Sequence, residues 1–216
     1  MKTKVVSKES LKDHLHDGMS IMVGGFMACG TPETIVDMII ESGIKDLTMY
    51  CNDAGFPDRG IGRIIAKGQC KKLYTSHIGL NPEAQAMMND GRMEIVLVPQ
   101  GTLAEQIRAG GSGLGGVLTP TGLGTLVEEG KQVLEIKGKK YLLEEAFKAD
   151  LSIVKANVAD TVGNSRLLGT TLNFNPLMAL AGEKVMVEAD EIVEHINQDD
   201  VTIPHVVVDY VIKEEH

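Results

Sequence analysis

The chain has 216 residues, 43% of them hydrophobic and 24% charged, and carries a formal net charge of −9 at neutral pH. These values predict a globular protein in which residues 1–216 form one domain. The acidic balance disfavours nucleic acid and anionic membranes as partners, because both are anionic and attract basic proteins.

The first half of the chain alternates short apolar runs with amphipathic segments. In chain order we expect a strand at Ser20–Val23, a helix at Glu33–Ser42, a strand at Leu47–Cys51, a helix at Gly60–Lys67, a strand at Lys72–Ser76, a helix at Pro82–Asn89, a strand at Ile95–Val98 and a helix at Leu103–Arg108. Gly43 suits a left-handed helix end, and Asn81 suits a helix cap. This alternation predicts an α/β fold with an open, mostly parallel sheet flanked by helices.

The second half of the chain is less regular. We expect a β-hairpin at Val133–Ile136 and Lys140–Leu143, further strands at Leu151–Lys155, Lys184–Val187 and Val206–Val208, and a helical turn at Met178–Ala181. Neither a Pro/Ser-rich linker nor an internal repeat is evident, so a single domain is the simplest prediction.

The segment Asp17–Pro32 holds the densest cluster of conformational signals. An apolar run leads into Gly24 and Gly25, which allow the backbone to approach a ligand closely. Thr31 is expected as the N-cap of the following helix and Pro32 as its first residue. Free amides at a helix start bind anions or carbonyl oxygens, so this segment predicts a ligand site.

Two glycine patterns share only their spacing with nucleotide-binding loops. The pattern that begins at Gly25 has Thr31 where a P-loop requires lysine. Gly111–Gly116 satisfies G-x-G-x-x-G, but a helix is expected before it, where a dinucleotide-binding fold needs a strand. Gly111 and Gly113 therefore belong either to an ordinary surface loop or to a mobile loop that closes over a ligand.

Two amide side chains follow predicted strands, and the carboxyl ends of strands in an open α/β sheet face the ligand crevice. Gln100 either donates an N–H to a developing oxyanion or caps the helix that starts near Thr102. Asn52 either bonds a substrate or forms a turn. Their positions in the sequence leave both choices open.

The three cysteines show no C-x-x-C spacing, which argues against disulfides and structural zinc and favours the reducing cytoplasm. Cys29, close to a helix start, is either an activated thiol or a small filler of the turn. His14 and His16 would face different directions on a helix, so no metal site is expected. No apolar run reaches the roughly 20 residues that span a bilayer.

The acidic residues gather at Glu128-Glu129, Glu144-Glu145 and Glu188–Glu194, which are expected to form solvated faces. None of them lies within a glycine-rich motif, where a nucleophilic carboxylate would be expected. The sequence therefore offers no obvious carboxylate nucleophile.

Four segments together resemble the alpha subunits of family I 3-oxoacid coenzyme A transferases: Asp17–Pro32, Asn52-Asp53, Pro99–Thr125 and Asn173–Pro176. The first segment has every element of that family's signature, namely an Asp-Gly pair, three apolar residues, Gly-Gly-Phe and Gly-x-Pro. The resemblance extends over nearly the whole chain, and it implies the family's open α/β sheet.

The resemblance implies a double-displacement reaction. A glutamate attacks an acyl-CoA, forms an acyl-glutamyl anhydride and then a glutamyl-CoA thioester, and an acceptor carboxylate takes the CoA. Coenzyme A would move as a substrate between acetoacetyl-CoA and acetate or butyrate, with no cofactor bound permanently. The family's glutamate lies in a beta subunit, in an S-E-N-G-like context that this chain lacks, so the chain is expected to be active only with that partner.

The resemblance also assigns residues to the site. Gln100 matches the family's oxyanion-stabilising residue, and Asn52 matches a position near the reacting groups. The turn associated with coenzyme A binding corresponds to Gly24, Gly25, Phe26, Met27, Ala28, Cys29 and Gly30. Two other functions are weighed against this one. A stand-alone CoA-thioester hydrolase or isomerase would need its own acid or base, and a CoA-binding regulatory module would bind its ligand without a beta subunit.

Overall fold

The computed structural model describes residues 2–215 and is built on a central sheet. The strands of this sheet are β1 (Ser20–Val23), β2 (Leu47–Cys51), β3 (Cys70–Thr75), β4 (Glu94–Leu97), β8 (Ala149–Asp160), β9 (Ser165–Arg166), β10 (Gly182–Val193) and β11 (Tyr210–Lys213). Seven of them run parallel in the order β11-β10-β8-β1-β2-β3-β4, and β9 pairs antiparallel with β8. The predicted fold class, an open and mostly parallel α/β sheet, is confirmed.

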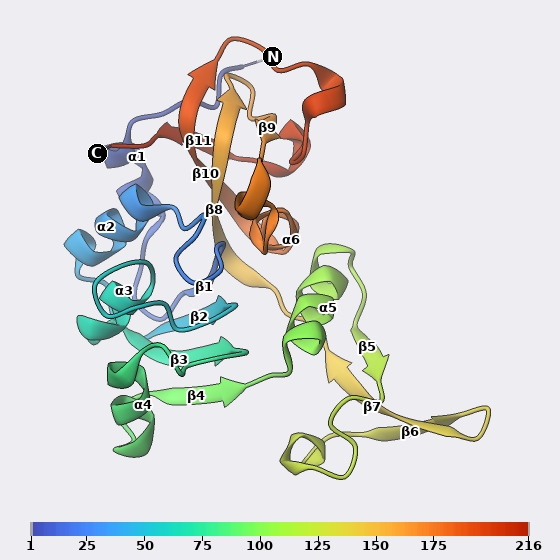
Figure 1. Ribbon diagram of the computed structural model, residues 1–216. Coiled ribbons are helices and arrows are strands. Elements are labelled where there is room, and N and C mark those ends of the chain that lie inside the picture. The colour runs from blue at the N-terminus through green and yellow to red at the C-terminus, as the bar shows by residue number, and fades with distance from the viewer. Residues whose placement is uncertain (1, 216) are drawn as a thin grey trace.

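Helices cover both faces of the sheet (Figure 1). Within the described residues the α-helices are α1 (Lys8–Leu11), α2 (Glu33–Ser42), α3 (Gly62–Ala66), α4 (Pro82–Asn89), α5 (Gln100–Gly111) and α6 (Asn175–Met178). Helices α2, α3 and α4 lie on one side of the sheet, and α5 and α6 lie on the other. Gly43 takes the expected left-handed conformation after α2, and the Asn81 side chain caps α4 at the Ala84 N–H.

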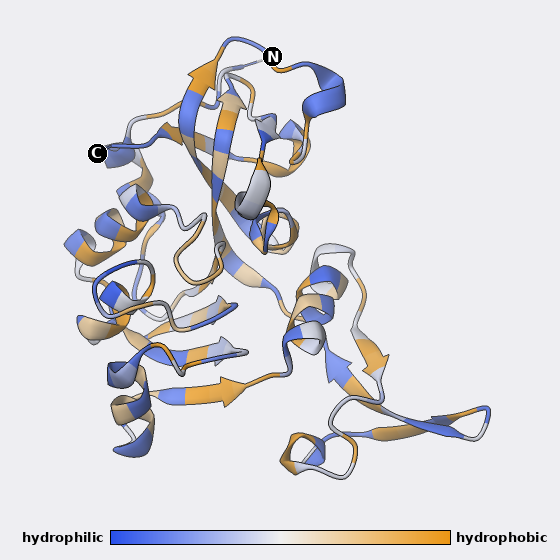
Figure 2. Ribbon diagram, viewed as in Figure 1, coloured by the Kyte–Doolittle hydropathy of each residue, from blue (hydrophilic) through white to orange (hydrophobic). Residues whose placement is uncertain are grey.

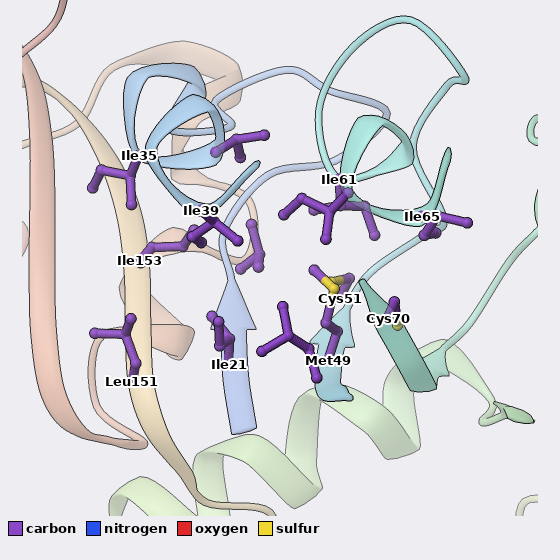
Figure 3. Close-up of a cluster of buried hydrophobic side chains, with 14 of the residues drawn as sticks. Ile21, Ile35, Ile39, Met49, Cys51, Ile61, Ile65, Cys70, Leu151 and Ile153 are labelled. Atoms are coloured by element: carbon purple, nitrogen blue, oxygen red, sulfur yellow. The ribbon is translucent and has the colours of Figure 1, made fainter. Parts of the chain in front are cut away.

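Alternate residues of each strand build two separate cores. Ile21 of β1 belongs to the core under α2 and α3, whereas its neighbour Met22 faces the core under α5 and α6. Figure 3 shows the first core, where Ile39 of α2 and Ile65 of α3 lie above the strand residue Met49. The five side chains named here are fully buried. Because both faces of the sheet are covered by a core, the direction in which each strand residue points is fixed.

The chain order places a topological switch at the centre of the sheet. From β1 the chain builds β2, β3 and β4 outward in one direction, and β8, β10 and β11 later extend the sheet in the other. Ligands of open α/β sheets bind outside the carboxyl ends of the strands at such a point. The segments that follow β1, β2 and β4 are therefore the place to look for a site.

A smaller sheet stands away from the main body. It consists of β5 (Gly116–Thr119), β6 (Val133–Ile136) and β7 (Lys139–Glu145), antiparallel in the order β5-β7-β6. Its β6–β7 hairpin turns at Lys137 and Gly138, both with positive φ, as the sequence predicts. Figure 2 shows hydrophobic residues along β5 and β6, and the Leu126 side chain between them is exposed.

Several predicted elements need correction. The residues Val206–Val208 do not form a strand: 205–207 make a 3₁₀ turn with Val206 exposed, and the strand is β11, which the sequence reading missed along with β5 and β9. The helical turn expected at Met178–Ala181 begins earlier, at Asn175, because Pro176 suits the first turn of α6. Local apolar content cannot distinguish a short strand from a turn when neither extends beyond four residues.

Two features that were expected to be exposed, the glycine loop at Gly111 and the acidic clusters, are partly buried. Gly111 is the last residue of α5, and a Cβ there would press on the side chain and backbone of Leu180, so the close packing at this position requires glycine. Only the residues after Gly111, including Gly113 with φ +73°, remain in the loop before β5. The acidic clusters are not all solvated either: Glu144 is buried against Lys131 at 2.7 Å, and Glu188 is completely buried.

Candidate active site at the carboxyl ends of the strands

Two turns with the same backbone hydrogen-bonding pattern follow β1 and β2. In the first, Phe26 and Cys29 exchange backbone hydrogen bonds of 3.0 and 2.9 Å, and the two residues between them have positive φ. In the second, Phe56 and Arg59 make the same exchange at 3.3 Å. The repeated pattern G-F-x-x-x-G, at residues 25–30 and 55–60, is a short internal repeat that the sequence analysis overlooked.

One amide at the start of α2 is not free for a ligand. The Ile35 N–H donates to Glu188 Oε2 at 3.0 Å, so a buried carboxylate of β10 already occupies the anion position. The helix also begins later than expected: Pro32 is its N-cap, and Thr31 does not cap it. One of the donors expected to be free at this helix start is therefore already taken by the protein itself.

The paired glycines accommodate the protein's own side chains. A Cβ on Gly24 would overlap the Asn175 side chain, and a Cβ on Gly25 would meet the Thr31 hydroxyl. Gly24, Gly25 and Ala28 line a recess of only about 10 Å³, too small for a ligand group. These glycines therefore allow the backbone to pack closely against the protein's own side chains, Asn175 and Thr31, and not against a ligand.

A relay of amides and one carboxylate connects the first turn to α5. Asp53 accepts the Met27 N–H at 2.8 Å and the Asn52 Nδ2 at 2.8 Å through one oxygen, and the Gly55 N–H at 2.9 Å through the other. Because Asn52 donates to Asp53, its Oδ1 faces the other way and accepts from Gln100 Nε2 at 2.6 Å. The carboxylate therefore fixes how both amides are oriented.

Gln100 is the first residue of α5, and its side chain donates to Asn52, which follows β2. No side chain caps α5, whose N-cap is Pro99, so Gln100 does not cap a helix that starts near Thr102. An amide nitrogen has two N–H groups, and Asn52 occupies one of them. The exposed Gln100 side chain can present the second to a ligand. Asn52, only 2% exposed, belongs to the relay and does not act merely as a turn former.

Three hollows meet around Phe26. One of about 430 Å³ is lined by the relay residues Asn52, Asp53 and Gln100 and by His77. A second, of about 560 Å³, lies between α5 and α6, and a third, of about 610 Å³, lies between the two turns and the segment 169–173. The Phe26 side chain, 39% exposed, lines all three. Together they form an open site large enough for an extended ligand.

The predicted site residues are distributed unevenly over these hollows. Met27 and Cys29 face the hollow between the turns, and Met27 also lines the hollow at the relay. Gly30 lies below, where its carbonyl accepts from Asn175, and Gly111 and Gly113 line none of the three hollows. Sequence reasoning gave no role to Asp53, although it follows Asn52 directly.

Only one carboxylate lines the three hollows among the residues that the structure describes, and that carboxylate is Asp53. It is 6% exposed, and both of its oxygens accept hydrogen bonds from within the protein. A carboxylate held in this way orients its neighbours and is not available as a nucleophile. Within the described residues, the site thus offers N–H donors but no free carboxylate that could attack a thioester.

The three thiols differ sharply in their surroundings. Burial raises the pKa of Cys70 to about 12 and raises the pKa of Cys51 well above its ordinary value. Cys29 is exposed at the rim of the hollow between the turns. A thiol reagent at pH 8 should therefore modify Cys29 and spare Cys51 and Cys70 in the folded protein, because burial blocks access to these two thiols and their raised pKa values suppress the reactive thiolate.

The measurement for this prediction is peptide mass spectrometry after brief treatment with iodoacetamide. Cys51 and Cys70 should become labelled only when the protein is unfolded, which serves as the internal control. Labelling of Cys51 or Cys70 at the rate of Cys29 in the native protein would contradict the burial described here.

Residues 2–215 contain no cluster of three or more His, Cys, Asp or Glu side chains arranged to hold a metal ion. In the same part of the chain, no helix is long and apolar enough to cross a membrane.

Known proteins resemble this chain over most of its length. A family model described as Coenzyme A transferase matches residues 6–214. The chain is 50% identical over 214 residues to "Acetate CoA-transferase subunit alpha" of Escherichia coli K12, which covers 98% of this chain and 97% of that protein. It is 46% identical over 216 residues to "Acetoacetyl-CoA:acetate/butyrate CoA transferase alpha subunit" of Clostridium acetobutylicum, covering 99% of each.

A solved structure shares the fold. An acyl-CoA transferase from Escherichia coli O157:H7, in a thioester complex with CoA, superposes with a TM-score of 0.87 at 20% identity. The match covers 99% of this chain and 47% of that one, so this chain spans about half the length of the solved protein. At this identity the likeness concerns the fold.

Proposed function

This chain belongs to the coenzyme A transferase family, and from that premise we propose that it is the alpha subunit of a heteromeric enzyme that moves CoA between acetoacetyl-CoA and acetate or butyrate. The relatives at 50% and 46% identity carry these substrates in their names and are themselves named alpha subunits. A companion beta subunit is therefore its partner, and acyl-CoA and carboxylate are its substrates.

One observation supports this division of labour. The hollows offer an amide donor at Gln100, but their single carboxylate, Asp53, is tied by three hydrogen bonds. Transfer of CoA through a glutamyl-CoA intermediate needs a free carboxylate that can attack a thioester. We assign that glutamate to the beta subunit, so that the complete site forms only between the two chains.

The chemistry follows from what each group can donate. When a glutamate attacks the thioester carbonyl, the carbonyl oxygen becomes an oxyanion, and the C–S bond then breaks to release the CoA thiolate. A pre-oriented N–H donor stabilises this oxyanion and needs no rearrangement at the moment of reaction. Gln100 supplies it, since Asn52 and Asp53 hold the amide in one orientation. The second half-reaction passes through an equivalent oxyanion and uses the same donor.

The first turn contributes the wall against which coenzyme A lies. Phe26, Met27 and Cys29 face the hollows, whereas Gly24, Gly25, Ala28 and Gly30 support them from below. Coenzyme A is a substrate that leaves in each cycle, and no cofactor is retained. The three free cysteines suit a reducing compartment, and we place the enzyme in the cytoplasm.

The test compares the isolated chain with the assembled complex. Mixed with its beta subunit, the chain should transfer CoA from acetoacetyl-CoA to acetate or butyrate, and either subunit by itself should be inactive. A complex that assembles but transfers nothing refutes the proposal. Turnover by the isolated chain would instead favour a stand-alone hydrolase or isomerase, and tight CoA binding by it in calorimetry would favour a regulatory module.

A further inference from the structure

The segment Asn173–Pro176 has so far no role in the proposed reaction, although it lies directly beneath the first turn. Asn175, the first residue of α6, is completely buried. Its side chain reaches three separate parts of the chain: the strand β8, the carbonyl of Gly30 and the carbonyl of Thr171.

The strand contact has a structural cause. The pairing of β1 with β8 ends at Val23 and Ile153, and one more bond joins the Gly24 N–H to the Ile153 carbonyl at 2.9 Å. Beyond this point β1 turns away, so the buried Lys155 N–H of β8 loses its strand partner. A buried backbone donor needs an acceptor, and Asn175 Oδ1 provides it at 2.9 Å. The side chain thus continues the sheet where β1 leaves it.

The other end of the same amide holds the turn. Asn175 Nδ2 donates to the Gly30 carbonyl at 2.9 Å and to the Thr171 carbonyl at 3.1 Å. At the opposite end of the turn, Asn175 Oδ1 occupies the space that a Cβ of Gly24 would need. One side chain therefore fixes both ends of the segment that carries Phe26 and Met27.

From these contacts we propose that Asn175 is a positioning residue, which sets the place of the Gly24–Gly30 turn and through it the orientation of Gln100. The connection runs through Met27, whose N–H is bound by Asp53, the carboxylate that orients Asn52 and Gln100. This inference rests on the proposed function, because its effect is read in the transfer reaction.

Asparagine suits this role because it combines an acceptor with two donors on a short stem. Asn175→Asp keeps the size of the side chain and the acceptor for Lys155, but an ionised carboxylate cannot donate to Gly30 or Thr171. A displaced turn should then misplace the reacting groups, and displacements near 1 Å cost up to about 100-fold in rate. We expect kcat of the assembled complex to fall about 10- to 100-fold, with a much smaller change in KM for the acyl-CoA.

Two further measurements separate positioning from simple loss of stability. Lower pH should partly restore kcat of Asn175→Asp relative to wild type, because a protonated carboxyl regains one donor. The added methyl group of Gly24→Ala would press on the Asn175 side chain and disturb the same contact. The double variant Gly24→Ala/Asn175→Asp should therefore show a smaller fold-decrease in kcat than the product of the decreases in the two single variants.

The matched control is Asn164→Ala. Asn164 is also a buried asparagine with bonds to Asp160 and His205, but it lies in the loop between β8 and β9 and lines none of the hollows. It should lower the thermal midpoint and leave kcat of the folded complex unchanged. If Asn175→Asp fails to assemble, Asn173→Ala decides the matter. It releases a second bond to the same turn, at the Cys29 carbonyl, together with the bonds of Asn173 to the Thr170 carbonyl and the Phe174 N–H, and should still lower kcat.

The outcomes are distinct. A lowered kcat with nearly unchanged KM, restored in part at lower pH, supports the positioning role. A wild-type kcat in the assembled Asn175→Asp complex, or in Asn173→Ala when that variant decides, overturns it. Absence of transfer by the wild-type complex is a separate result, since it refutes the proposed function itself.

Discussion

Replacing Gln100 by alanine should slow CoA transfer by the assembled complex about 10²- to 10³-fold, the usual cost of removing one oxyanion donor. The loss should be in kcat, because the oxyanion exists only after attack on the thioester. Gln100→Glu should be equally slow, since a carboxylate of similar reach cannot donate and would face Asn52 Oδ1 with repulsion. Steady-state kinetics with acetoacetyl-CoA and acetate measures both variants.

The control for this experiment is Gln198→Ala. Gln198 is an exposed glutamine in a 3₁₀ turn and lines none of the three hollows. It should leave both rate and assembly unchanged. If Gln100→Ala retains the wild-type kcat, the amide is not the oxyanion donor and the relay has only a structural purpose.

Lys155→Ala should have the largest effect on stability. Lys155 Nζ lies 3.0 Å from Glu188, 2.8 Å from Asp190 and 2.6 Å from Glu214. Its removal leaves Glu188 buried without a counter-charge, and breaking such a pair costs about 3–5 kcal/mol in the free energy of unfolding. The start of α2 should loosen as well, because Glu188 also binds the Ile35 N–H. Urea unfolding measures the loss.

The pH dependence provides a second check on this variant. Burial raises the pKa of Glu188 above its ordinary value of 4.5, and Lys155 opposes that shift. Without Lys155 the folded state should hold a proton on Glu188 to higher pH, so the variant's stability falls as pH rises above about 4.5. The deficit against wild type should thus shrink toward acid pH.

Lys184→Ala is the matched control on the neighbouring strand. Lys184 pairs with Asp209 at 3.4 Å, and both side chains are substantially exposed. Exposed pairs contribute about 0–1 kcal/mol, so this substitution should be nearly neutral. If both lysine variants lost the same free energy of unfolding, the buried ion pairs of Lys155 would stabilise the fold no more than an exposed pair does.

Much of the first half of the fold follows from local sequence. The strands Ser20–Val23 and Leu47–Cys51 and the helices Glu33–Ser42 and Pro82–Asn89 agree with the structure at both ends. Each combines a clear apolar period with a glycine, proline or asparagine at its boundary. The C-terminal strands begin and end where long-range pairing allows, as in β11, which pairs with β10 and starts after the predicted Val206–Val208.

The site was predictable in part. Gln100 and Asn52 follow predicted strands, and the parallel order places both strand ends at the same edge of the sheet, where the two side chains are hydrogen-bonded. The roles of Asp53 and Asn175 depend on contacts between segments distant in sequence, which no local pattern reveals. Glu188 shows the same limit, since a carboxylate in an acidic run gives no sign that it will be buried at the start of α2.

The central claim is that this chain supplies N–H donors while its partner supplies the nucleophile. Incubation of the assembled complex with acetoacetyl-CoA, followed by intact-mass spectrometry of the two separated subunits, tests it directly. The expected result is a mass increase equal to CoA less one water, as a glutamyl thioester, on the beta subunit and none on this chain. A CoA adduct on a glutamate of this chain would contradict the account.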